Sequence, residues 1–558
     1  MKQYELGEWD LSELAKNPKS SAFQKQIKDL ENQAKKFEKI KSKLSPKMSS
    51  KQFKMILQQV EEISHKMSKI GGYASLAYSS NTQSDEATSL MTQMSKLGSE
   101  ISNKILFFDL WWKTQVDEKN ATRLMKETGE LKEYLTYKRL FAKYALSESE
   151  EKIINTLDVT GISALVKLYD KITNAFEYKM KIGSKTKVMT REELTNYVRS
   201  TNPKIRETAY KTILTKYTEN KGVIGEIYQN IVLNWKNEGI ELRGYNSPIS
   251  MRNIGNDVDD KTIESLLTIC RKNSPVFQKF FLQKAKMLDM KKLQRYDLYA
   301  PAASKIKEKN YSYNQSVKLV FESLGKFSST LEEFARKVFN ENHIDSSVRP
   351  GKRDGAFCST LTPKITPYVL VNFTGKSRDV FTLAHELGHA VHSQAAQDRS
   401  ILVQDAPLPL AETASTFSEL LLYDNLSEKI SDDQKKIMLA EKIDDLYATI
   451  LRQSYFTIFE VDAHNLISKG TTIDEISKVY LQNLKEQFGN LLALSLFQRY
   501  KKEGNDFVKS YIDILSAGGS KKPEKLLSEH GFDIRSPKFW QEGFDYVNQQ
   551  VKTLSSLN

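Results

Sequence analysis

Cysteine, glycine and proline are all scarce in this chain of 558 residues. Its two cysteines, Cys270 and Cys358, exclude a scaffold built on disulfides and are typical of a reducing compartment. The 24 glycines and 13 prolines are about 4% and about 2% of the chain, below the usual shares of roughly 7% and 5%. So few helix breakers predict long helices, and they argue against a β-sandwich or barrel with frequent turns.

Long apolar runs are absent as well. No stretch approaches the roughly 18 apolar residues that a membrane-spanning helix needs, and the segment Met1–Asp10 has no apolar core of signal-peptide length. Hydrophobic residues make up 39% of the chain and charged residues 27%, with a mean hydropathy of −0.51. We therefore expect a cytoplasmic, mostly helical protein with no membrane partner.

The charge balance is basic but evenly mixed. Lysine and arginine number 83 against 70 acidic residues, which gives a net charge of +13 and a pI of about 9.1. A basic pI is compatible with a nucleic-acid-binding helical protein, and that alternative rests on the pI alone. Even the dense stretch Lys35–Lys43 contains Glu38, and intermixed charge of both signs is the ordinary pattern of a solvated surface. We therefore expect no nucleic-acid partner.

Hydrophobic residues recur at helical spacing in the first hundred positions. In two stretches separated by Ser45-Pro46 they step by three or four residues, which predicts helices with a core-facing stripe. Similar patterns over 91–108 and 127–141 predict further helices, and Thr190 followed by Glu193 predicts a helix N-terminus. The two stripes consist of Phe23, Ile27, Leu30, Ala34, Phe37 and Ile40, then Phe53, Ile56, Leu57, Val60 and Ile63.

The composition changes between about residues 345 and 380. Prolines and glycines cluster there, and between them lie two β-prone runs, at 356–358 and 368–373. This pattern predicts one or two small hairpins that end at Gly375, directly before a long helical segment. We expect this small sheet to lie beside that helix and to have a role in the same functional site.

The helical segment carries the motif His385-Glu386-Leu387-Gly388-His389. Two histidines four residues apart lie one helical turn apart, so both imidazoles can bind one metal ion. Glu386 can then reach a water on the metal rather than the metal itself. The alternative is a helix with two structural histidines, but the preceding apolar run and the small Gly388 suit a helix packed against a neighbour. The motif predicts one Zn²⁺ per chain.

Hydrolytic zinc sites keep three protein ligands and leave the fourth position for water. A metzincin would need glycine three residues after the second histidine and histidine three residues further on. This sequence has His392 and Ala395 there, which excludes that class. A fourth protein ligand would close the site, so we interpret His392 as a packed or substrate-facing residue.

The third ligand has to come from further along the chain. A second helix is predicted over 409–420, where Glu412 and Glu419 lie seven residues apart and therefore on one face. Glu412 is the predicted third ligand. Asp398 and Asp405 are weaker alternatives because their segment has no helical pattern.

These segments resemble the zinc oligopeptidases of the oligoendopeptidase F and thimet oligopeptidase type. The likeness is carried by residues 385–393 and 412–419, and extends to 9–12, 295–301, 352–358 and 515–520. It implies an elongated, two-lobed, almost all-helical fold with a deep central channel and a small sheet next to the zinc-binding helix. It also implies cleavage of short peptides but not of folded proteins. We expect an N-terminal helical region over 1–110, a helical lid-like region over 111–190 and a catalytic domain over 191–558.

The resemblance also implies roles for residues at matching positions. The zinc ligands are His385, His389 and Glu412, and Glu386 is the general base. Asp379 matches an acidic position that supports a ligand imidazole, and Glu419 is its companion. From the residues themselves, we expect the strand at Gly355, Ala356 and Phe357 to pair with an extended peptide by edge addition.

One departure from the family concerns the oxyanion donors. The resemblance implies a histidine- and tyrosine-bearing loop before a helix like 491–496. Here Leu484–Gly489 runs almost directly into that helix, and residues 465–529 contain no histidine. Tyr480, Tyr500 and Tyr511 lie in periodic helical context. A segment of about thirty residues is thus missing near Phe488-Gly489. The sequence fits a catalytically weakened peptide- or zinc-binding relative, or a truncated gene model.

Overall fold

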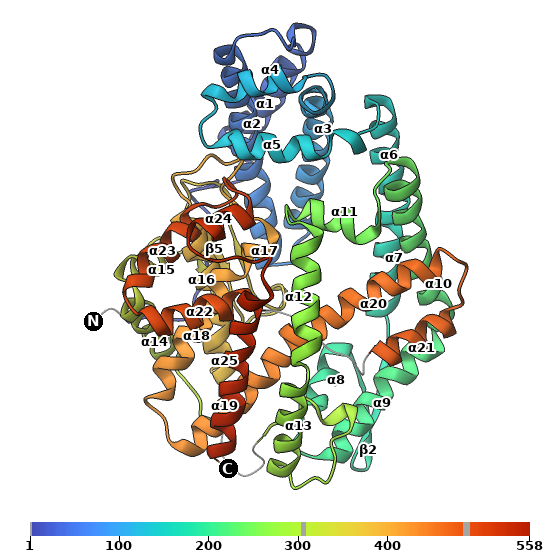
Figure 1. The fold of residues 1–558 in the computed structure, drawn as a ribbon, viewed down its shortest axis with the longest axis vertical. Helices are drawn as coiled ribbons and strands as arrows, with labels where there is room; N and C mark the ends of the chain where they lie inside the picture. The colour runs from blue at the N-terminus through green and yellow to red at the C-terminus, as the bar shows by residue number, and fades with distance from the viewer. Residues whose placement is uncertain (1–2, 303–308, 484–490, 558) are drawn as a thin grey trace.

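The amino-terminal helices pack along the stripes that the sequence predicts. A computed structural model describes residues 3–302, 309–483 and 491–557, and the elements of this first group are at the top of Figure 1. Phe23, Leu30 and Phe37 of the first stripe and Phe53 of the second are each at most 1% exposed. The group consists of α1 (Ser21–Glu38), α2 (Ser50–Ser80), α3 (Asp85–Thr114), α4 (Glu118–Leu124), α5 (Leu131–Leu140) and the 3₁₀ turns Lys41–Lys43, Met125–Glu127 and Ala142–Tyr144.

The division of the chain after residue 110 is still a prediction, and the structure places that position inside α3. The last turn of α3 packs on α2, where the Trp112 ring stacks on Phe53 with centroids 4.8 Å apart. The helices that follow α3 share this core, since Leu124 and Leu135 are buried in the same cluster. The first core therefore continues beyond residue 110.

A second group of helices lies on the right of Figure 1. It includes the hairpin β1 (Tyr178–Ile182) and β2 (Lys185–Met189), and the capping box of Thr190 and Glu193 begins α8 as predicted. Two helices from late in the chain, α20 (Arg452–Ile467) and α21 (Ile473–Asn483), pack on α10. The other members are α6 (Glu148–Thr160), α7 (Ile162–Asn174), α8 (Arg191–Val198), α9 (Pro203–Glu219), α10 (Lys221–Trp235), the π-helix Lys236–Leu242 and α11 (Pro248–Gly255).

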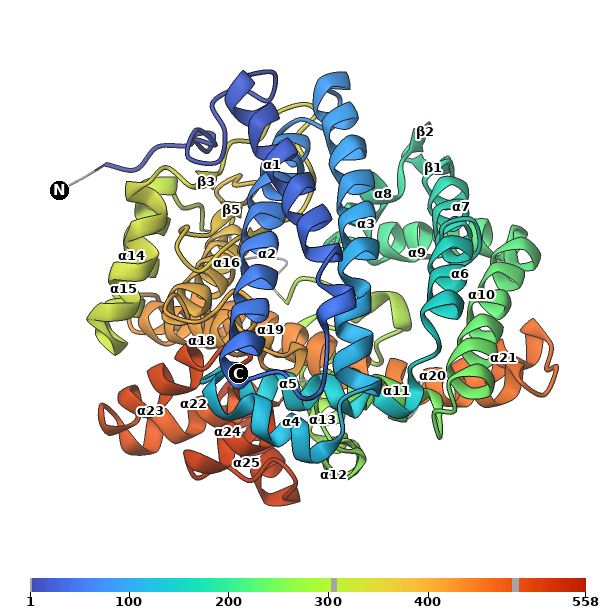
Figure 2. The same ribbon diagram turned by 90° about the horizontal axis from the view of Figure 1, so that it is seen from above.

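A third group holds the largest core and lies opposite the second, as the view from above shows (Figure 2). Its centre is α16 (Ser377–Ala395), which packs on α15, α18 and α23. The other members are α12 (Asp260–Asn273), α13 (Pro275–Met287), the 3₁₀ turn Arg295–Asp297, α14 (Tyr313–Phe327), α15 (Ser329–Asn340), α17 (Leu408–Ala411), α18 (Thr413–Ser427), α19 (Asp432–Leu446), the π-helix Tyr447–Leu451, α22 (Leu492–Glu503), α23 (Asp506–Ser516), α24 (Pro523–Glu529) and α25 (Pro537–Ser556). The prediction of a mostly helical fold is confirmed.

The small sheet lies directly before α16 in the chain and packs against it. Its strand order is β3 (Ile344–Asp345), β5 (Tyr368–Leu370), β4 (Phe357–Ser359), so β5 is central and β4 is an edge strand. The predicted hairpin is present as the antiparallel pair of β4 and β5, with Cys358 opposite Val369. The parallel strand β3 was not predicted. Within the described residues, the outer edge of β4 has no partner strand.

No helix within residues 3–302, 309–483 and 491–557 combines the length and the hydrophobicity that crossing a bilayer requires.

Candidate metal centre

The motif residues are positioned by the close approach of α16 and α18. Gly388 lies where these helices touch, and a Cβ atom there would come within 2.6 Å of both the Ala414 carbonyl oxygen and the Ser415 Cα. Both neighbours are backbone atoms and cannot move aside easily. Glycine at this position therefore lets α18 lie against the turn that carries His385 and His389.

Asp379 differs from the expectation that it supports a ligand imidazole. Its Oδ2 accepts hydrogen bonds from the amide nitrogen and the hydroxyl of Thr374, both at 2.7 Å, and from the Lys376 amide nitrogen at 3.1 Å. These contacts are made at the start of α16, where a helix leaves its first amide donors without partners. Among the described residues the Asp379 carboxylate has no hydrogen bond to a histidine, so it caps the helix that carries the motif.

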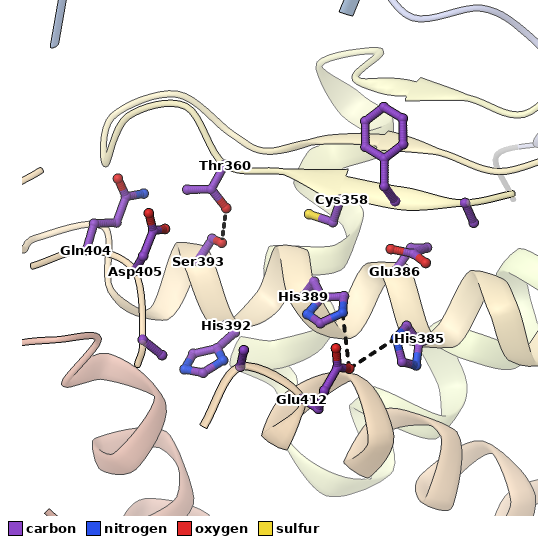
Figure 3. A pocket seen from close by; sticks show the side chains of 14 residues that line it. Cys358, Thr360, His385, Glu386, His389, His392, Ser393, Gln404, Asp405 and Glu412 are labelled. Atoms are coloured by element: carbon purple, nitrogen blue, oxygen red, sulfur yellow. Dashed lines mark hydrogen bonds and ion pairs between the residues drawn. The ribbon is translucent and has the colours of Figure 1, made fainter. Parts of the chain in front are cut away.

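Glu412 lies at the break between α17 and α18, not inside one continuous helix as predicted. Its Oε2 lies 3.3 Å from Nε2 of His385 and 3.4 Å from Nε2 of His389 (Figure 3). Ser415 on the first turn of α18 donates its hydroxyl to the same oxygen at 2.6 Å and so fixes the carboxylate. The helix break thus aims Glu412 at both imidazoles.

The three side chains fit a tetrahedral metal. Their ligand atoms all lie within 4.8 Å of one another. With metal–ligand bonds of about 2.0–2.1 Å at tetrahedral angles, two ligand atoms are ~3.3 Å apart, which agrees with the two separations from Glu412. Two imidazole nitrogens and one carboxylate form a donor set typical of catalytic zinc. The arrangement is therefore suited to hold zinc and to leave one coordination position open.

The charges around His385 favour a cation. Its Nδ1 donates to Oε1 of Glu419 at 2.5 Å, while its Nε2 faces Glu412. Burial by itself lowers the pKa of His385, but the hydrogen bonds to Glu412 and Glu419 outweigh it and raise the pKa to about 10. The same histidine contacts hold the pKa of Glu412 far below its usual value. The cluster thus attracts positive charge, and a metal ion would replace the proton.

Glu386 lines the same pocket without taking part in the ligand cluster. It lies on the side of α16 that faces β4, is only 7% exposed, and is separate from the His385–His389–Glu412 group (Figure 3). Burial raises its pKa, and the nearby His385 and His389 oppose that shift. A carboxylate with a raised pKa is a better proton acceptor than an exposed glutamate.

A cavity of about 460 Å³ contains the cluster and follows α16 beneath the edge strand β4. Of the predicted substrate-binding residues, Ala356, Phe357 and His392 line it. Gly355 does not: it lies in the turn before β4 with φ +79°, and its carbonyl accepts a hydrogen bond from Asn372. The full lining is Ala356, Phe357, Cys358, Thr360, His385, Glu386, His389, His392, Ser393, Gln404, Asp405, Ala406, Ala411 and Glu412.

His392 is packed rather than free, although one side of its ring reaches the cavity. It is 8% exposed and hydrogen-bonds the backbone of Ala411. Burial lowers its pKa to about 4, so the ring is neutral near pH 7. It is not part of the ligand cluster.

Two of the tyrosines that the sequence places in helical context, Tyr500 and Tyr511, do not line the cavity. Tyr511 is 1% exposed, and its hydroxyl donates to the Thr413 carbonyl at 3.3 Å. Tyr500 packs against Phe327, with ring centroids 4.8 Å apart. Within the part of the chain that the structure describes, no tyrosine lines the cavity. The proposed deletion at Phe488-Gly489 lies outside the described residues.

Several cavity residues were missed by sequence reasoning. Ser393 could have been found, since it lies four residues after His389 and therefore on the same face of α16. Its hydroxyl and that of Thr360 are hydrogen-bonded to each other. No sequence pattern around Gln404 indicates a role in a site, and the sequence indicates Asp405 only as a weaker alternative to Glu412 as the third metal ligand. They are placed by a distant contact of their backbone with Gly518 and Gly519.

A His-Glu-x-x-His motif with a glutamate further along the chain as third ligand is typical of zinc metallopeptidases. The helical fold and the cluster of His385, His389 and Glu412 therefore indicate a metallopeptidase. The chain matches the model of Peptidase family M3 over residues 196–491, more than half of its length, and the model of Oligopeptidase F over residues 114–178. The protein therefore belongs to peptidase family M3, as the sequence resemblance suggested.

Individual relatives agree with this assignment. The chain is 27% identical to an oligoendopeptidase F homolog of Borreliella burgdorferi, over 95% of this chain and 94% of the relative. It is 23% identical to the chromosomal oligoendopeptidase F of Lactococcus lactis subsp. cremoris, over 90% and 89%. Its fold is similar to the crystal structure of a candidate peptidase from Chlamydophila abortus, with a TM-score of 0.82, 21% identity and coverage of 99% and 98%. Oligoendopeptidase-F from Enterococcus faecium gives a TM-score of 0.70, with 18% identity and coverage of 96% and 98%.

Proposed function

We propose that this protein is a zinc-dependent endopeptidase that hydrolyses short, unstructured peptides. The observation that carries the proposal is the convergence of His385, His389 and Glu412 in one cavity, with Glu386 beside them and outside the ligand set. Family membership supports a peptide substrate and a zinc cofactor. We propose one zinc ion per chain.

The residues divide the chemistry between them. When bound, zinc would polarise the scissile carbonyl and make water a stronger nucleophile at neutral pH. Glu386 accepts the proton of the attacking water and later delivers it to the departing amine nitrogen. Glu419 holds the His385 ring by its Nδ1 and keeps the Nε2 directed at the metal position.

The edge strand β4 gives the substrate a place to bind. Its outer edge has no partner strand in the described residues, and Ala356 and Phe357 line the cavity. An extended peptide can add to this edge through main-chain hydrogen bonds, which fix its position with little demand on its sequence. The peptide would then lie between β4 and the motif helix. We further propose that residues 191–558 form the catalytic domain, with 1–110 and 111–190 as helical regions that limit access.

Metal analysis of three variants tests the assignment. His389→Ala and Glu412→Ala each remove one of three protein ligands and should greatly weaken zinc binding. Glu386→Gln should keep zinc, because this side chain acts on the water, but should abolish cleavage of a fluorogenic peptide. Zinc retained by Glu412→Ala together with zinc lost by Glu386→Gln would show that the ligands are assigned wrongly.

The lining of the cavity favours a second candidate function. No tyrosine lines the cavity in the described residues, and tyrosine donors are what the family's loop supplies to the oxyanion. The alternative is a relative that binds peptide and zinc with little turnover. Tight peptide binding by the zinc-loaded chain without detectable cleavage would favour it.

A further inference from the structure

Asp405 is a cavity carboxylate without a counterion. It lines the cavity with Gln404 at the end away from Glu386 (Figure 3). Among the described residues its carboxylate has no hydrogen bond or ion pair, and burial raises its pKa without a neighbouring cation to oppose the shift. It is also outside the ligand cluster. Within the described residues, the Asp405 carboxylate therefore neither stabilises the fold through a polar contact nor belongs to the metal ligands.

The backbone that carries Asp405 is held firmly. Val403 and Gln404 before it are 2% and 4% exposed. The Gly519 amide donates to the Val403 carbonyl at 2.8 Å, and a Cβ at Gly519 would lie 2.6 Å from the Asp405 carbonyl oxygen. This segment therefore packs against the glycine turn that follows α23, and the carboxylate enters the cavity from a backbone held in place.

Along the axis of α16, the separation of Asp405 from the metal centre corresponds to two or three residues of an extended peptide. Along the axis of α16, Figure 3 shows Asp405 at the Ser393 end, and Ser393 is four residues after His389. At 1.5 Å per residue these positions are about 6 Å apart along the helix, and His385 lies about 6 Å further back. An extended peptide advances about 3.3 Å per residue. A peptide whose scissile bond lies at the metal centre would therefore bring its second or third residue to Asp405.

Charge favours one direction for a peptide with free termini. Cys358 of β4 lies above His389 in Figure 3, and the chain continues from it to Thr360, whose hydroxyl is hydrogen-bonded to that of Ser393. A peptide antiparallel to β4 would bring its amino-terminal side to Asp405, and a parallel peptide its carboxyl-terminal side. The carboxylate attracts an ammonium group and repels a terminal carboxylate.

We propose that Asp405 binds a cationic group of the substrate, two or three residues to the amino-terminal side of the scissile bond. The group is either the α-ammonium of the peptide or a lysine or arginine side chain. This inference rests on the proposed peptidase function and adds a specificity determinant to it.

The test uses the zinc-loaded full-length chain and a set of neutral octapeptides, acetylated and amidated. In one series a single lysine replaces norleucine at each position in turn, and in another the amino terminus is left free. Mass spectrometry of the products locates the cleaved bond, and kcat/KM is measured for each peptide. Binding to the Glu386→Gln variant, followed by fluorescence anisotropy, gives the same comparison without turnover.

We expect lysine two or three residues before the cleaved bond to improve kcat/KM and affinity about tenfold over norleucine. Asp405→Asn should remove this preference, and Asp405→Lys should transfer it to a glutamate at the same position. Asp398→Asn is the matched control, because Asp398 is an exposed residue of the same segment and does not line the cavity. The free-terminus series shows whether the α-ammonium can replace the side chain.

Two results would overturn the inference, and they are distinguishable. If neutral peptides are cleaved or bound but lysine gives no advantage, or if Asp405→Asn keeps the advantage, Asp405 is not a cation-binding residue and the peptidase function stands. If the zinc-loaded chain neither binds nor cleaves any peptide of the set, the proposed function fails, and the role of Asp405 fails with it.

Discussion

Nδ1 of His385 lies 2.5 Å from Oε1 of Glu419, seven residues after the proposed ligand Glu412. A carboxylate in this position fixes the tautomer of the imidazole and raises its basicity as a ligand. Glu412 at the break before α18 is thus a proposed metal ligand, and Glu419 in the second turn of α18 supports another ligand.

The first prediction concerns Glu419→Gln, which keeps the size of the side chain and removes its charge. Zinc affinity should fall about 10–100-fold, because the His385 ring loses its ionic acceptor. Competition with a chromogenic chelator measures it. Glu428→Gln is a control at the other end of α18, where an exposed pair with Lys326 contributes little. Equal affinity in Glu419→Gln and the wild type would show that Glu419 does not support the ligand.

The second prediction concerns Gly388→Ala. The added methyl would meet the backbone of α18 at 2.6 Å, so the two helices must separate. We expect the free energy of unfolding to fall by about 1–3 kcal/mol and zinc affinity to fall with it. Urea denaturation and chelator competition measure the two effects. Gly98→Ala in α3 has nothing within 4 Å of the new Cβ and should stabilise by about 0.5–1 kcal/mol. A stable Gly388→Ala with normal zinc affinity would contradict the packing argument.

Much of this architecture follows from local sequence patterns. The stripes of α1 and α2 and the capping box at Thr190 depend on residues within one or two turns, and the structure contains all three. The spacing of His385 and His389 is equally local, because one helical turn determines it.

The remainder depends on contacts between distant segments. The parallel pairing of β3 with β5 brings together Ile344 and Val369, which no turn connects directly. Asp379 was assigned by likeness to a ligand-supporting position, but the free amide donors at the start of α16 bind its carboxylate. The position of Asp405 depends on Gly519, more than a hundred residues later in the chain.

The third prediction concerns the pH dependence of stability. The His343 ring stacks on Tyr368 of β5 with centroids 3.9 Å apart, and its Nδ1 hydrogen-bonds the Thr366 carbonyl at 2.8 Å. Burial lowers the pKa of His343 from its ordinary value of 6.5, although the Thr366 contact opposes the shift. Below about pH 6.5 the His343 imidazole therefore binds a proton more readily in the unfolded chain than in the folded protein.

The contribution of His343 to stability is thus complete above about pH 6.5 and is lost as the pH falls towards the lower folded pKa. His343→Phe keeps a ring against Tyr368 and removes the titration. In chelator-treated protein, this variant should lose less of its unfolding free energy between pH 7.5 and 5.5 than the wild type does. Other titrating groups are common to both proteins, so parallel pH profiles would contradict the assignment.

The fourth prediction concerns substrate size. The metal centre lies in a cavity of about 460 Å³ beneath a single edge strand, which leaves room for one extended chain. We expect cleavage of unstructured peptides up to roughly twenty residues, which extend over about 66 Å at 3.3 Å per residue. A stable folded protein and a tightly cyclised form of a cleaved peptide should both survive, as gel and mass analysis would show. Rapid degradation of the folded protein would refute the enclosed site.

The last prediction concerns the rate of hydrolysis. The oxyanion that develops during peptide cleavage needs hydrogen-bond donors, and removing one typically costs about 10²–10³ in rate. We interpret the sequence near Phe488-Gly489 as lacking the segment that supplies these donors in the resembling family. Tyr511, the obvious substitute, is enclosed and directs its hydroxyl at the Thr413 carbonyl. We therefore expect zinc binding typical of the fold, with hydrolysis at least about a hundredfold slower than in relatives that keep the loop.

The loss should appear in kcat rather than KM, because donors to the tetrahedral intermediate contribute little to binding of the ground state. A graft of a histidine- and tyrosine-bearing loop after Gly489 should recover rate in a fluorogenic peptide assay without changing the zinc content. A glycine–serine insert of the same length is the matched control and should recover nothing. If the ungrafted chain is as fast as relatives with the loop, another residue donates to the oxyanion and the absent segment is not catalytic in this protein.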